Sequence, residues 1–391
     1  MPRNQILVLI LAGGAGGRLE LLTHTRAKPA VPFAGTHRLI DFPLSNCLNA
    51  GIDDVWVSQQ FNPVSLSDHL ANGRPWDLDR TTGGLLILHP RQGNEGGEGF
   101  QTGTAQALWS QAELIREFDP PALVVVSADA VYKLDYRAVA EAHREGGKAV
   151  TMVTTEVEPE DAGRYGVVQV DGERITDYAY KPDEPEGNVI ANEVFVFTPE
   201  PVLAALDALE RERGEAELDD LGDHLLPRLV DAGEARAHPF DGYWRDVGTI
   251  PAYHTAHMEL VQDEPPIDLD DPAWPILTRA VSRRAAGQVG ASATVSACLI
   301  APGATVAGDV SGSVLGRGVV VEEGATVRDS VLLEGTVVRS GATVTRAIVD
   351  DHVDVRADVG EPDGEIALIG LHTTVDETLP GGARYPEVDS D

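Results

Sequence analysis

The sequence predicts an α/β domain with a mostly parallel sheet, followed by a C-terminal left-handed parallel β-helix. From residue 6 to about residue 250, short branched apolar runs alternate with helical patterns, which favours parallel strands covered by helices on both faces. Beyond residue 288, single aliphatic residues recur every five or six positions between Gly, Ala, Ser and Asp. This hexapeptide spacing is typical of a parallel β-helix. A chain of 391 residues has room for both parts.

Seven short apolar runs and six helical patterns define the expected first domain. The expected strands are 6–11, 55–58, 85–88, 123–126, 149–154, 166–170 and 194–197. The expected helices are 44–50, 64–71, 104–118, 136–145, 201–213 and 221–232. Residues 70–100, rich in Gly, Arg, Asp and Asn, are expected to form a flexible loop near a cleft.

The β-helix prediction rests on a repeated tetrapeptide. Gly-Ala-Thr-Val occurs at 303–306, 324–327 and 341–344, with spacings of 21 and 17 residues. Each coil of a β-helix buries one aliphatic residue per side, so several coils must stack to be stable. We therefore divide the chain into a first domain at 1–250, a helix and Pro- and Asp-rich linker at 251–288, a β-helix at 289–375, and a polar, disordered tail at 376–391.

Composition excludes several classes of protein. A net charge of -33 argues against nonspecific nucleic-acid binding. Two distant cysteines, Cys47 and Cys298, indicate buried thiols rather than disulfides or a zinc site. No run of 18 apolar residues and no signal peptide is evident, so we expect an unexported protein in the cytoplasm with no membrane contact.

The first strand ends in a glycine-rich segment that predicts a phosphate site. Gly13, Gly14, Gly16 and Gly17 follow the apolar run directly, and Arg18 comes next. Glycines let the backbone turn its N–H groups toward an anion, and an arginine supplies a fixed cationic fork. Neither the G-x-G-x-x-G fingerprint of dinucleotide-binding folds nor the P-loop pattern is present. A second cation, Lys28, follows ten residues after Arg18.

The segment A-G-G-x-G-x-R-L, followed by R-A-K-P-A, resembles the opening of nucleoside-diphosphate-sugar pyrophosphorylases. Its continuation at 38–47, R-L-I-D-F-P-L-S-N-C, is similar to the bacterial ADP-glucose pyrophosphorylase family. The resemblance implies a Rossmann-like nucleotidyltransferase domain that converts ATP and glucose 1-phosphate to ADP-glucose and pyrophosphate with Mg²⁺. It also implies a homotetramer, control by small-molecule effectors and a place in glycogen synthesis.

The resemblance also assigns roles to residues. Asp129 follows the buried strand 123–126, and its segment S-A-D-A-V-Y-K resembles the family's A-G-D-H-I-Y-K, whose aspartate binds magnesium. Asp246 lies in Y-W-R-D-V-G-T, which matches the family without a break. The expected catalytic residues are Arg18, Lys28, Asp129 and Asp246, and the two aspartates are the expected metal ligands. The expected nucleotide-binding residues are Leu11, Ala12, Gly13, Gly14, Gly16, Gln60, Gly103 and Thr104. The expected sugar-phosphate-binding residues are Gly166, Lys181, Asp220 and Trp244.

The chain departs from the family around the expected sugar. The family's F-x-E-K-P becomes Y-A-Y-K-P, so that Tyr180 replaces a glutamate. The family's S-M-G-I-Y-V-F becomes A-N-E-V-F-V-F at 191–197, with the loss of a serine and a tyrosine hydroxyl. Gln101 and Thr102 replace the tyrosine and arginine of W-Y-R-G-T-A. A site with fewer hydroxyl partners should bind glucose weakly or prefer another sugar, unless the changes are tolerated drift.

Two alternatives to the main hypothesis stay open. One is the same chemistry on a different sugar 1-phosphate or nucleotide. The other is a non-catalytic regulatory subunit that pairs with a paralogous catalytic chain. The presence of the four expected catalytic residues argues against a regulatory subunit, whereas the altered sugar motifs favour it.

Overall fold

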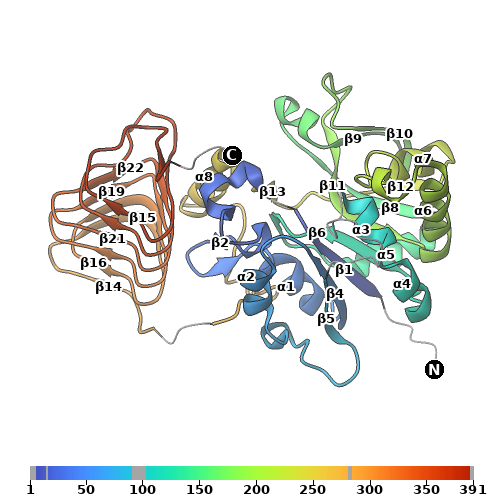
Figure 1. The fold of residues 1–391 in the computed structure, drawn as a ribbon, viewed down its shortest axis with the longest axis horizontal. Helices are drawn as coiled ribbons and strands as arrows, with labels where there is room; N and C mark the ends of the chain where they lie inside the picture. Colours follow the sequence, from blue (N-terminus) through green and yellow to red (C-terminus); the bar gives the residue numbers. More distant parts are fainter. Residues whose placement is uncertain (1–5, 15, 90–102, 281–283, 388–391) are drawn as a thin grey trace.

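The computed structural model describes residues 6–14, 16–89, 103–280 and 284–387, which form an α/β domain beside a β-helix (Figure 1). A nine-stranded sheet forms the centre of the first domain. In spatial order its strands are β5 (Gly84–Leu88), β4 (Asp54–Gln59), β1 (Leu7–Ala12), β6 (Leu123–Ser127), β11 (Val189–Phe197), β8 (Val150–Glu156), β12 (Ala235–Pro239), β10 (Arg174–Tyr180) and β9 (Gly166–Asp171).

The expected parallel arrangement holds for part of this sheet only. Strands β5, β4, β1 and β6 are parallel neighbours, and β12 runs parallel to β8. Strands β9, β10 and β11 pair antiparallel with their neighbours, so the sheet is mixed. The reason is local: β10, which the sequence analysis missed, follows β9 through a tight turn at Gly172, with φ +62°. A turn this short joins only antiparallel strands.

Helices cover both faces of the sheet, as predicted. Alternate residues of β1 face two separate cores, with Leu7 and Leu9 on one side and Val8 and Ile10 on the other. The first core is closed by α3 (Thr104–Trp109), α4 (Ala112–Phe118), α6 (Pro199–Arg213) and α7 (Leu225–Asp231). The second core is closed by α1 (Asp41–Asn49), α2 (Pro63–Leu70) and α5 (Tyr136–Gly146).

Two expected helices and the expected loop differ in the structure. The helix predicted at 104–118 is two helices separated at Ser110 and Gln111. The helix predicted from residue 221 begins at Leu225, because the preceding segment passes against the Tyr180 ring at Gly222. In the predicted flexible loop, the described part contains β5 and a fully buried Trp76, whose indole N–H donates to the Leu277 carbonyl at 3.1 Å. Residues 90–100 lie outside the described ranges.

The C-terminal part is a parallel β-helix, as predicted. One sheet contains β14 (Gln288–Val289), β16 (Thr305–Val306), β18 (Val320–Val321), β21 (Val337–Val338), β24 (Asp354–Val355) and β26 (Thr374–Val375). The other contains β15 (Thr294–Ile300), β17 (Asp309–Leu315), β19 (Thr326–Arg328), β20 (Val331–Leu332), β22 (Thr343–Thr345), β23 (Ala347–Val349), β25 (Ala367–Ile369) and β27 (Arg384–Tyr385). Small aliphatic residues fill the interior between the two sheets.

The last strand corrects the expectation of a disordered tail from residue 376. Strand β27 pairs in parallel with β25, and the Arg384 guanidinium bonds to the Glu20 carboxylate of the first domain. Leu379 is buried and bridges to Val359. The β-helix therefore continues to Tyr385. The prediction was wrong because the few apolar residues of the last coil are spaced between polar ones, which makes the segment look polar.

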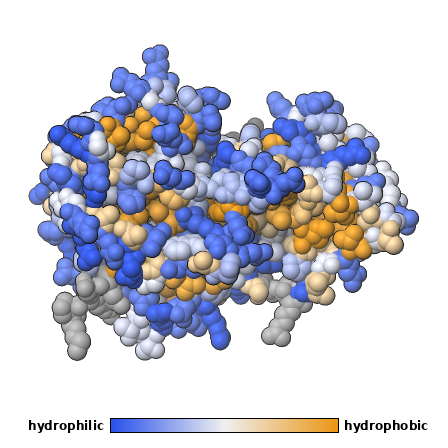
Figure 2. Space-filling view, turned by 180° about the vertical axis from the view of Figure 1, so that it is seen from behind, coloured by the Kyte–Doolittle hydropathy of each residue, from blue (hydrophilic) through white to orange (hydrophobic). Residues whose placement is uncertain are grey.

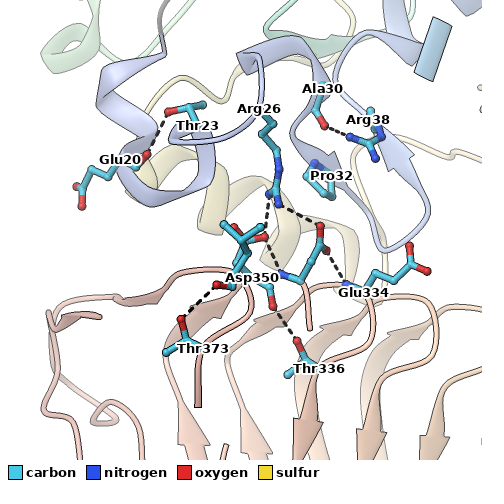
Figure 3. Close-up of polar contacts among 12 residues, drawn as sticks. Glu20, Thr23, Arg26, Ala30, Pro32, Arg38, Glu334, Thr336, Asp350 and Thr373 are labelled. Carbon is cyan, nitrogen blue, oxygen red and sulfur yellow. Dashed lines mark hydrogen bonds and ion pairs between the residues drawn. The ribbon is translucent and has the colours of Figure 1, made fainter. Parts of the chain in front are cut away.

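The two domains share a hydrophobic core. Helix α8 (Ile250–Leu260) lies between them, and its Ile250 and Tyr253 pack with Phe33 of β2 (Pro32–Phe33). The same cluster includes Val331 and Leu368 of the β-helix. Close by, Arg26 reaches across to the β-helix and bonds to Asp350 (Figure 3). The domains are thus joined by apolar packing and by a buried ion pair.

The structure bears on three expectations from composition: a polar surface, the absence of a membrane-spanning segment and two buried cysteines. Hydrophilic residues cover much of the face shown in Figure 2, with an apolar patch over the β-helix. None of the helices in the described ranges is long and apolar enough to cross a membrane. Cys47 is buried as expected, whereas Cys298, on an outer coil of the β-helix, is only partly buried.

Candidate active site

A cavity of about 630 Å³ lies at the carboxyl ends of the parallel strands β1, β4 and β6. Ligands of open α/β sheets bind in the crevice outside the carboxyl ends of the strands. Most of the residues predicted from sequence line the cavity. They are Leu11, Ala12, Gly13, Gly14, Gly16, Arg18, Lys28, Gln60, Gly103, Thr104, Asp129, Gly166, Lys181 and Asp220.

The glycine-rich segment after β1 forms one wall. Gly16 has φ +73°, and a Cβ there would stand 2.8 Å from the Thr23 side chain, so only glycine fits without strain. Thr23 donates its hydroxyl hydrogen to the Gly16 carbonyl at 2.8 Å and holds the turn. The buried Gln60 side chain lies close to Gly13, with its Oε1 3.4 Å from where a Cβ of Gly13 would be. The backbone can therefore approach a ligand closely at this wall.

Lys28 and Asp129 form a close ion pair at the cavity. The Lys28 Nζ lies 2.5 Å from Asp129 Oδ2, and the Ser127 hydroxyl donates to Asp129 Oδ1 at 2.5 Å. Burial raises the pKa of the Asp129 carboxyl, but Lys28 and the two hydrogen bonds outweigh burial and lower it overall. Burial likewise opposes the charge on Lys28, and Asp129 and Asp246 together raise its pKa. Both side chains are thus held in their charged forms.

A two-stranded ladder places Asp246 beside Asp129, although 117 residues separate them in the chain. Strand β13 (Trp244–Asp246) pairs antiparallel with β7 (Ala130–Tyr132), and the Val247 N–H donates to the Asp129 carbonyl at 3.2 Å. Asp246 accepts hydrogen bonds from the Gly248 N–H at 2.8 Å and from Arg164 at 3.0 Å. Burial and the nearby Asp129 raise the pKa of Asp246.

Gly248 is where the charged groups converge. A Cβ on this glycine would lie 2.7 Å from Lys28 Nζ, 2.8 Å from Asp246 Oδ1 and 3.4 Å from Arg18 Nη2. Gly248 itself lines the cavity, whereas Asp246, which is bonded to the Gly248 N–H, is not among the lining residues. The four residues predicted as catalytic are therefore brought together around one point of the cavity wall.

Trp244 lies elsewhere than expected. Its ring packs edge-to-face on Tyr165, with the ring centroids 5.4 Å apart, and it does not line the cavity. In the ladder Trp244 lies opposite Tyr132, two residues before Asp246. Its buried indole N–H has no hydrogen-bond partner among the described residues.

The opposite end of the cavity holds a hydrogen-bonded chain. Lys181 Nζ donates to the Tyr180 hydroxyl at 2.6 Å, and that hydroxyl donates to Asp220 Oδ2 at 2.8 Å. The other oxygen of Asp220 accepts bonds from the backbone N–H and the hydroxyl of Thr104, at 3.0 and 3.1 Å. Gly103 precedes Thr104 and passes so close to Asp219 that a Cβ would lie 2.1 Å from its carbonyl oxygen. Gln101 and Thr102 lie outside the described ranges.

Sequence reasoning missed Glu193, which lines the cavity from β11. Burial, Asp129 and Asp246 raise the pKa of its carboxyl to about 7, and Lys28 and Lys181 oppose this shift. The signal was present in the sequence, because the stretch A-N-E-V-F-V-F places a glutamate where S-M-G-I-Y-V-F has glycine. Arg164, which bonds to Asp246, carried no sequence signal and was also missed.

Comparison with known proteins agrees with this geometry. The nucleotidyl transferase family model matches residues 7–263, more than half of the chain, and the model named GlmU-like, C-terminal hexapeptide matches residues 282–364. The glucose-1-phosphate adenylyltransferase of Clostridium beijerinckii is 38% identical over 84% of this chain and 85% of its own length. The enzyme of the same name from Desulforamulus reducens is 38% identical over 89% of this chain and 87% of its own length. A third, from Acetivibrio thermocellus, is 36% identical over 92% and 85%.

These matches cover both domains, and the fold and the cavity agree with them. The chain belongs to the nucleotidyl transferase family, in the branch of the glucose-1-phosphate adenylyltransferases that the sequence resemblance indicated.

Proposed function

We propose that this nucleotidyltransferase transfers the adenylyl group of ATP to glucose 1-phosphate and releases pyrophosphate. The observation that carries the proposal is the convergence of Arg18, Lys28 and Asp246 on Gly248, with Asp129 bound to Lys28. Cations at one point of a cavity lined by a glycine-rich turn suit a triphosphate, and the relatives are named for this reaction. The same residues argue against a purely regulatory subunit.

In this proposal the chain binds and aligns two anions rather than moving protons. A phosphate oxygen of the sugar phosphate attacks the α-phosphorus of ATP and forms a new P–O bond. The bond from the α-phosphorus to the bridging oxygen of pyrophosphate breaks, and its electron pair leaves with pyrophosphate. Arg18 and Lys28 stabilise the growing charge on the leaving group, because cations aimed at developing charge lower the barrier. Lys181 holds the sugar phosphate in line, and Gln60 faces the adenine.

The residues present fit a divalent cation, and we propose Mg²⁺. No group of three or more His, Cys, Asp or Glu side chains that could hold a metal occurs in the described ranges. Asp129 and Asp246 offer hard carboxylate oxygens around one ammonium group, and Mg²⁺ is commonly bound by one or two carboxylates together with substrate phosphates. When bound, the metal would polarise the reacting phosphates and neutralise their charge.

A second candidate is the same transfer to a different sugar 1-phosphate. Tyr180, Ala191 and Phe195 all line the cavity, and each replaces a residue that could bond a sugar hydroxyl in the family motif. This candidate changes the substrate and keeps the mechanism.

Pyrophosphate release separates these proposals. Purified protein with Mg²⁺ is assayed with ATP, GTP, UTP and TTP, each against several sugar 1-phosphates. We expect turnover with ATP and glucose 1-phosphate, and its loss in Asp129→Ala. Turnover with another sugar would favour the second candidate. Absence of turnover in all combinations from folded protein would contradict both and favour a regulatory subunit.

We also propose that the protein forms a homotetramer in the cytoplasm and responds to small-molecule effectors, as the resemblance implies. Light scattering coupled to size exclusion tests the assembly. Screening phosphorylated metabolites in the pyrophosphate assay tests the control.

A further inference from the structure

Glu193 has a backbone conformation that is unusual for its residue type. Its φ is +62°, in the left-handed region that favours glycine. It lies where β11 changes partners: Ala191 pairs with β9, Val194 pairs with β6, and the ladder with β8 shifts register between Ala191 and Phe195. Residues held in this region tend to occur at functional sites, where the surrounding structure maintains them.

Glu193 lines the cavity from β11, between Ala191, which pairs with Gly166 of β9, and Val194, which pairs with Val126 of β6. It is partly buried, and its charge affects groups on both sides. Burial, Asp129 and Asp246 raise the pKa of its carboxyl, while Lys28 and Lys181 lower it. After burial, Glu193 is the largest influence that raises the pKa of Tyr178, which also lines the cavity. A ligand that extended from Lys28 to Lys181 would therefore lie beside this carboxylate.

Glu193 lines the cavity, and no residue in the described ranges donates a hydrogen bond to its carboxylate. The neighbouring side chains explain why Glu193 lacks a hydrogen-bond donor. Tyr180, which replaces a glutamate of the family motif, gives its hydroxyl to Asp220, and Ala191 and Phe195 have no hydroxyl. Relative to the family motif, the site has thus exchanged a glutamate for a tyrosine on β10, lost two hydroxyl groups on β11 and gained one carboxylate on β11.

We propose that Glu193 is a specificity-determining residue whose carboxylate accepts hydrogen bonds from hydroxyl groups of the sugar ring. The inference rests on the proposed transfer to a sugar 1-phosphate. A carboxylate repels the phosphate, so Glu193 faces the ring, while Lys181 binds the phosphate. Hydrogen bonds from hydroxyls to a carboxylate are stronger than those between neutral groups, so one such residue can replace several weaker partners.

The test compares wild type with Glu193→Gln and Glu193→Gly, using glucose 1-phosphate and its 2-, 3-, 4- and 6-deoxy analogues. Glu193→Gln keeps the size of the side chain, and Glu193→Gly relieves the backbone conformation, so at least one variant should fold. Exposed Glu141→Gln on α5 serves as a matched control. We expect the KM for glucose 1-phosphate to rise about 10- to 100-fold in both variants, with the KM for ATP changed less than twofold.

The deoxy analogues identify the contact. Wild type should discriminate against the analogue that lacks the bonded hydroxyl, and this discrimination should shrink in Glu193→Gln and disappear in Glu193→Gly. Equal penalties on all analogues, or no change in the KM for the sugar phosphate, would overturn the inference. A shift in the Mg²⁺ concentration required for half-maximal activity, larger than the shift in sugar KM, would show a metal ligand instead and would also overturn it.

The failure of this inference can be told apart from failure of the proposed function. If wild type prefers another sugar 1-phosphate, the proposed function fails and the same comparison is run on that sugar. If no turnover occurs, calorimetric binding of glucose 1-phosphate to wild type and Glu193→Gln gives the comparison without catalysis. Equal affinities there would overturn the role of Glu193.

Discussion

Arg26 donates to Asp350 at 2.8 Å across the boundary between the two domains (Figure 3). The same guanidinium bonds to Asp351 at 3.0 Å, and Arg26 and Asp350 are both buried. Arg26 is two residues from Lys28, so the segment that carries this proposed catalytic cation is anchored to the β-helix. Burial raises the pKa of Asp350 to about 6 even though Arg26 opposes the shift. Arg26 therefore compensates for the free-energy cost of burying the Asp350 carboxylate.

Replacing Arg26 with methionine should destabilise the protein by about 3–5 kcal/mol, because it leaves Asp350 buried without its cation. The double variant Arg26→Met/Asp350→Asn should recover part of this loss, since it removes both charges. Urea denaturation measures both effects. The exposed pair between Arg228 and Glu212 provides the control, and Arg228→Met should change stability little. A double variant as unstable as Arg26→Met alone would contradict the interpretation.

Removing either member of the Lys28–Asp129 pair should abolish most activity. Lys28→Ala and Asp129→Asn should each lower kcat about 100- to 1000-fold, because each removes a group that acts on charge in the transition state. The KM for ATP should change less. Steady-state pyrophosphate release measures both constants. Lys148→Ala, outside the cavity, is the matched control, and a kcat loss of less than tenfold in both site variants would argue against the assigned roles.

Local sequence predicted the glycine turn, the strand before it and the cations after it, because each depends on neighbours in the chain. The position of Asp246 beside Asp129 came from a motif match, and the β13–β7 ladder is its physical cause. Trp244 belongs to the same motif but packs on Tyr165 outside the cavity lining, and the motif carries no information about this contact. Glu193 was visible in the sequence as a departure from the family motif, but its place in the cavity wall depends on how β11 pairs with three other strands.

The tetrapeptide repeats show the same limit in the β-helix. The 17-residue spacing brings Val327 of β19 directly beside Val344 of β22, so this repeat is one coil. The 21-residue spacing does not, because Val306 belongs to β16 in the other sheet. The sequence pattern therefore predicted the architecture, whereas the register required the structure.

Gly248→Ala should impair catalysis more than stability. The new Cβ would meet the Lys28 ammonium at 2.7 Å and the Asp246 carboxylate at 2.8 Å. Both are ends of side chains that can move, so the fold should tolerate the change while the catalytic groups shift. We expect kcat to fall about 10- to 100-fold, since displacements of about 1 Å can cost this much. A thermal melt alongside kinetics checks the expectation. Gly187→Ala, which meets only the flexible Gln169 amide, is the control. Unchanged kcat in Gly248→Ala would contradict the convergence of charges at this point.

Tyr180→Phe tests the hydrogen-bonded chain of Lys181, Tyr180 and Asp220, at the end of the cavity where we propose that the sugar phosphate binds. The variant removes the hydroxyl that accepts from Lys181 and donates to Asp220, so Lys181 loses its fixed position. The KM for the sugar 1-phosphate should rise about 3- to 10-fold, as expected for loss of one hydrogen bond, and the KM for ATP should stay constant. Tyr243→Phe, whose hydroxyl bonds to Glu259 outside the cavity, should change neither constant. A rise in the KM for ATP as large as that for the sugar would refute a role confined to the sugar end.

The stability of the protein should fall in acid because of His257. Its ring is fully buried on α8, where Nε2 accepts from the Ala34 N–H at 3.0 Å and Nδ1 donates to the Tyr253 carbonyl at 2.8 Å, so the neutral ring is required. Burial lowers the pKa of His257 to about 3, whereas an unfolded chain has a histidine pKa of about 6.5. Between these values the unfolded state binds a proton that the folded state does not. Stability is therefore lost as pH falls through this window, by up to about 1.4 kcal/mol per pH unit.

The acid response of His257 is separated from that of other groups by comparing the wild type with a variant. Groups with raised pKa values, such as Asp350, increase stability as pH falls, but they do so equally in a variant that lacks only the imidazole. Urea denaturation of wild type and His257→Gln from pH 6.5 to pH 4.5 isolates the histidine: the variant should lose stability less steeply, and equal slopes would mean that His257 does not control the acid response.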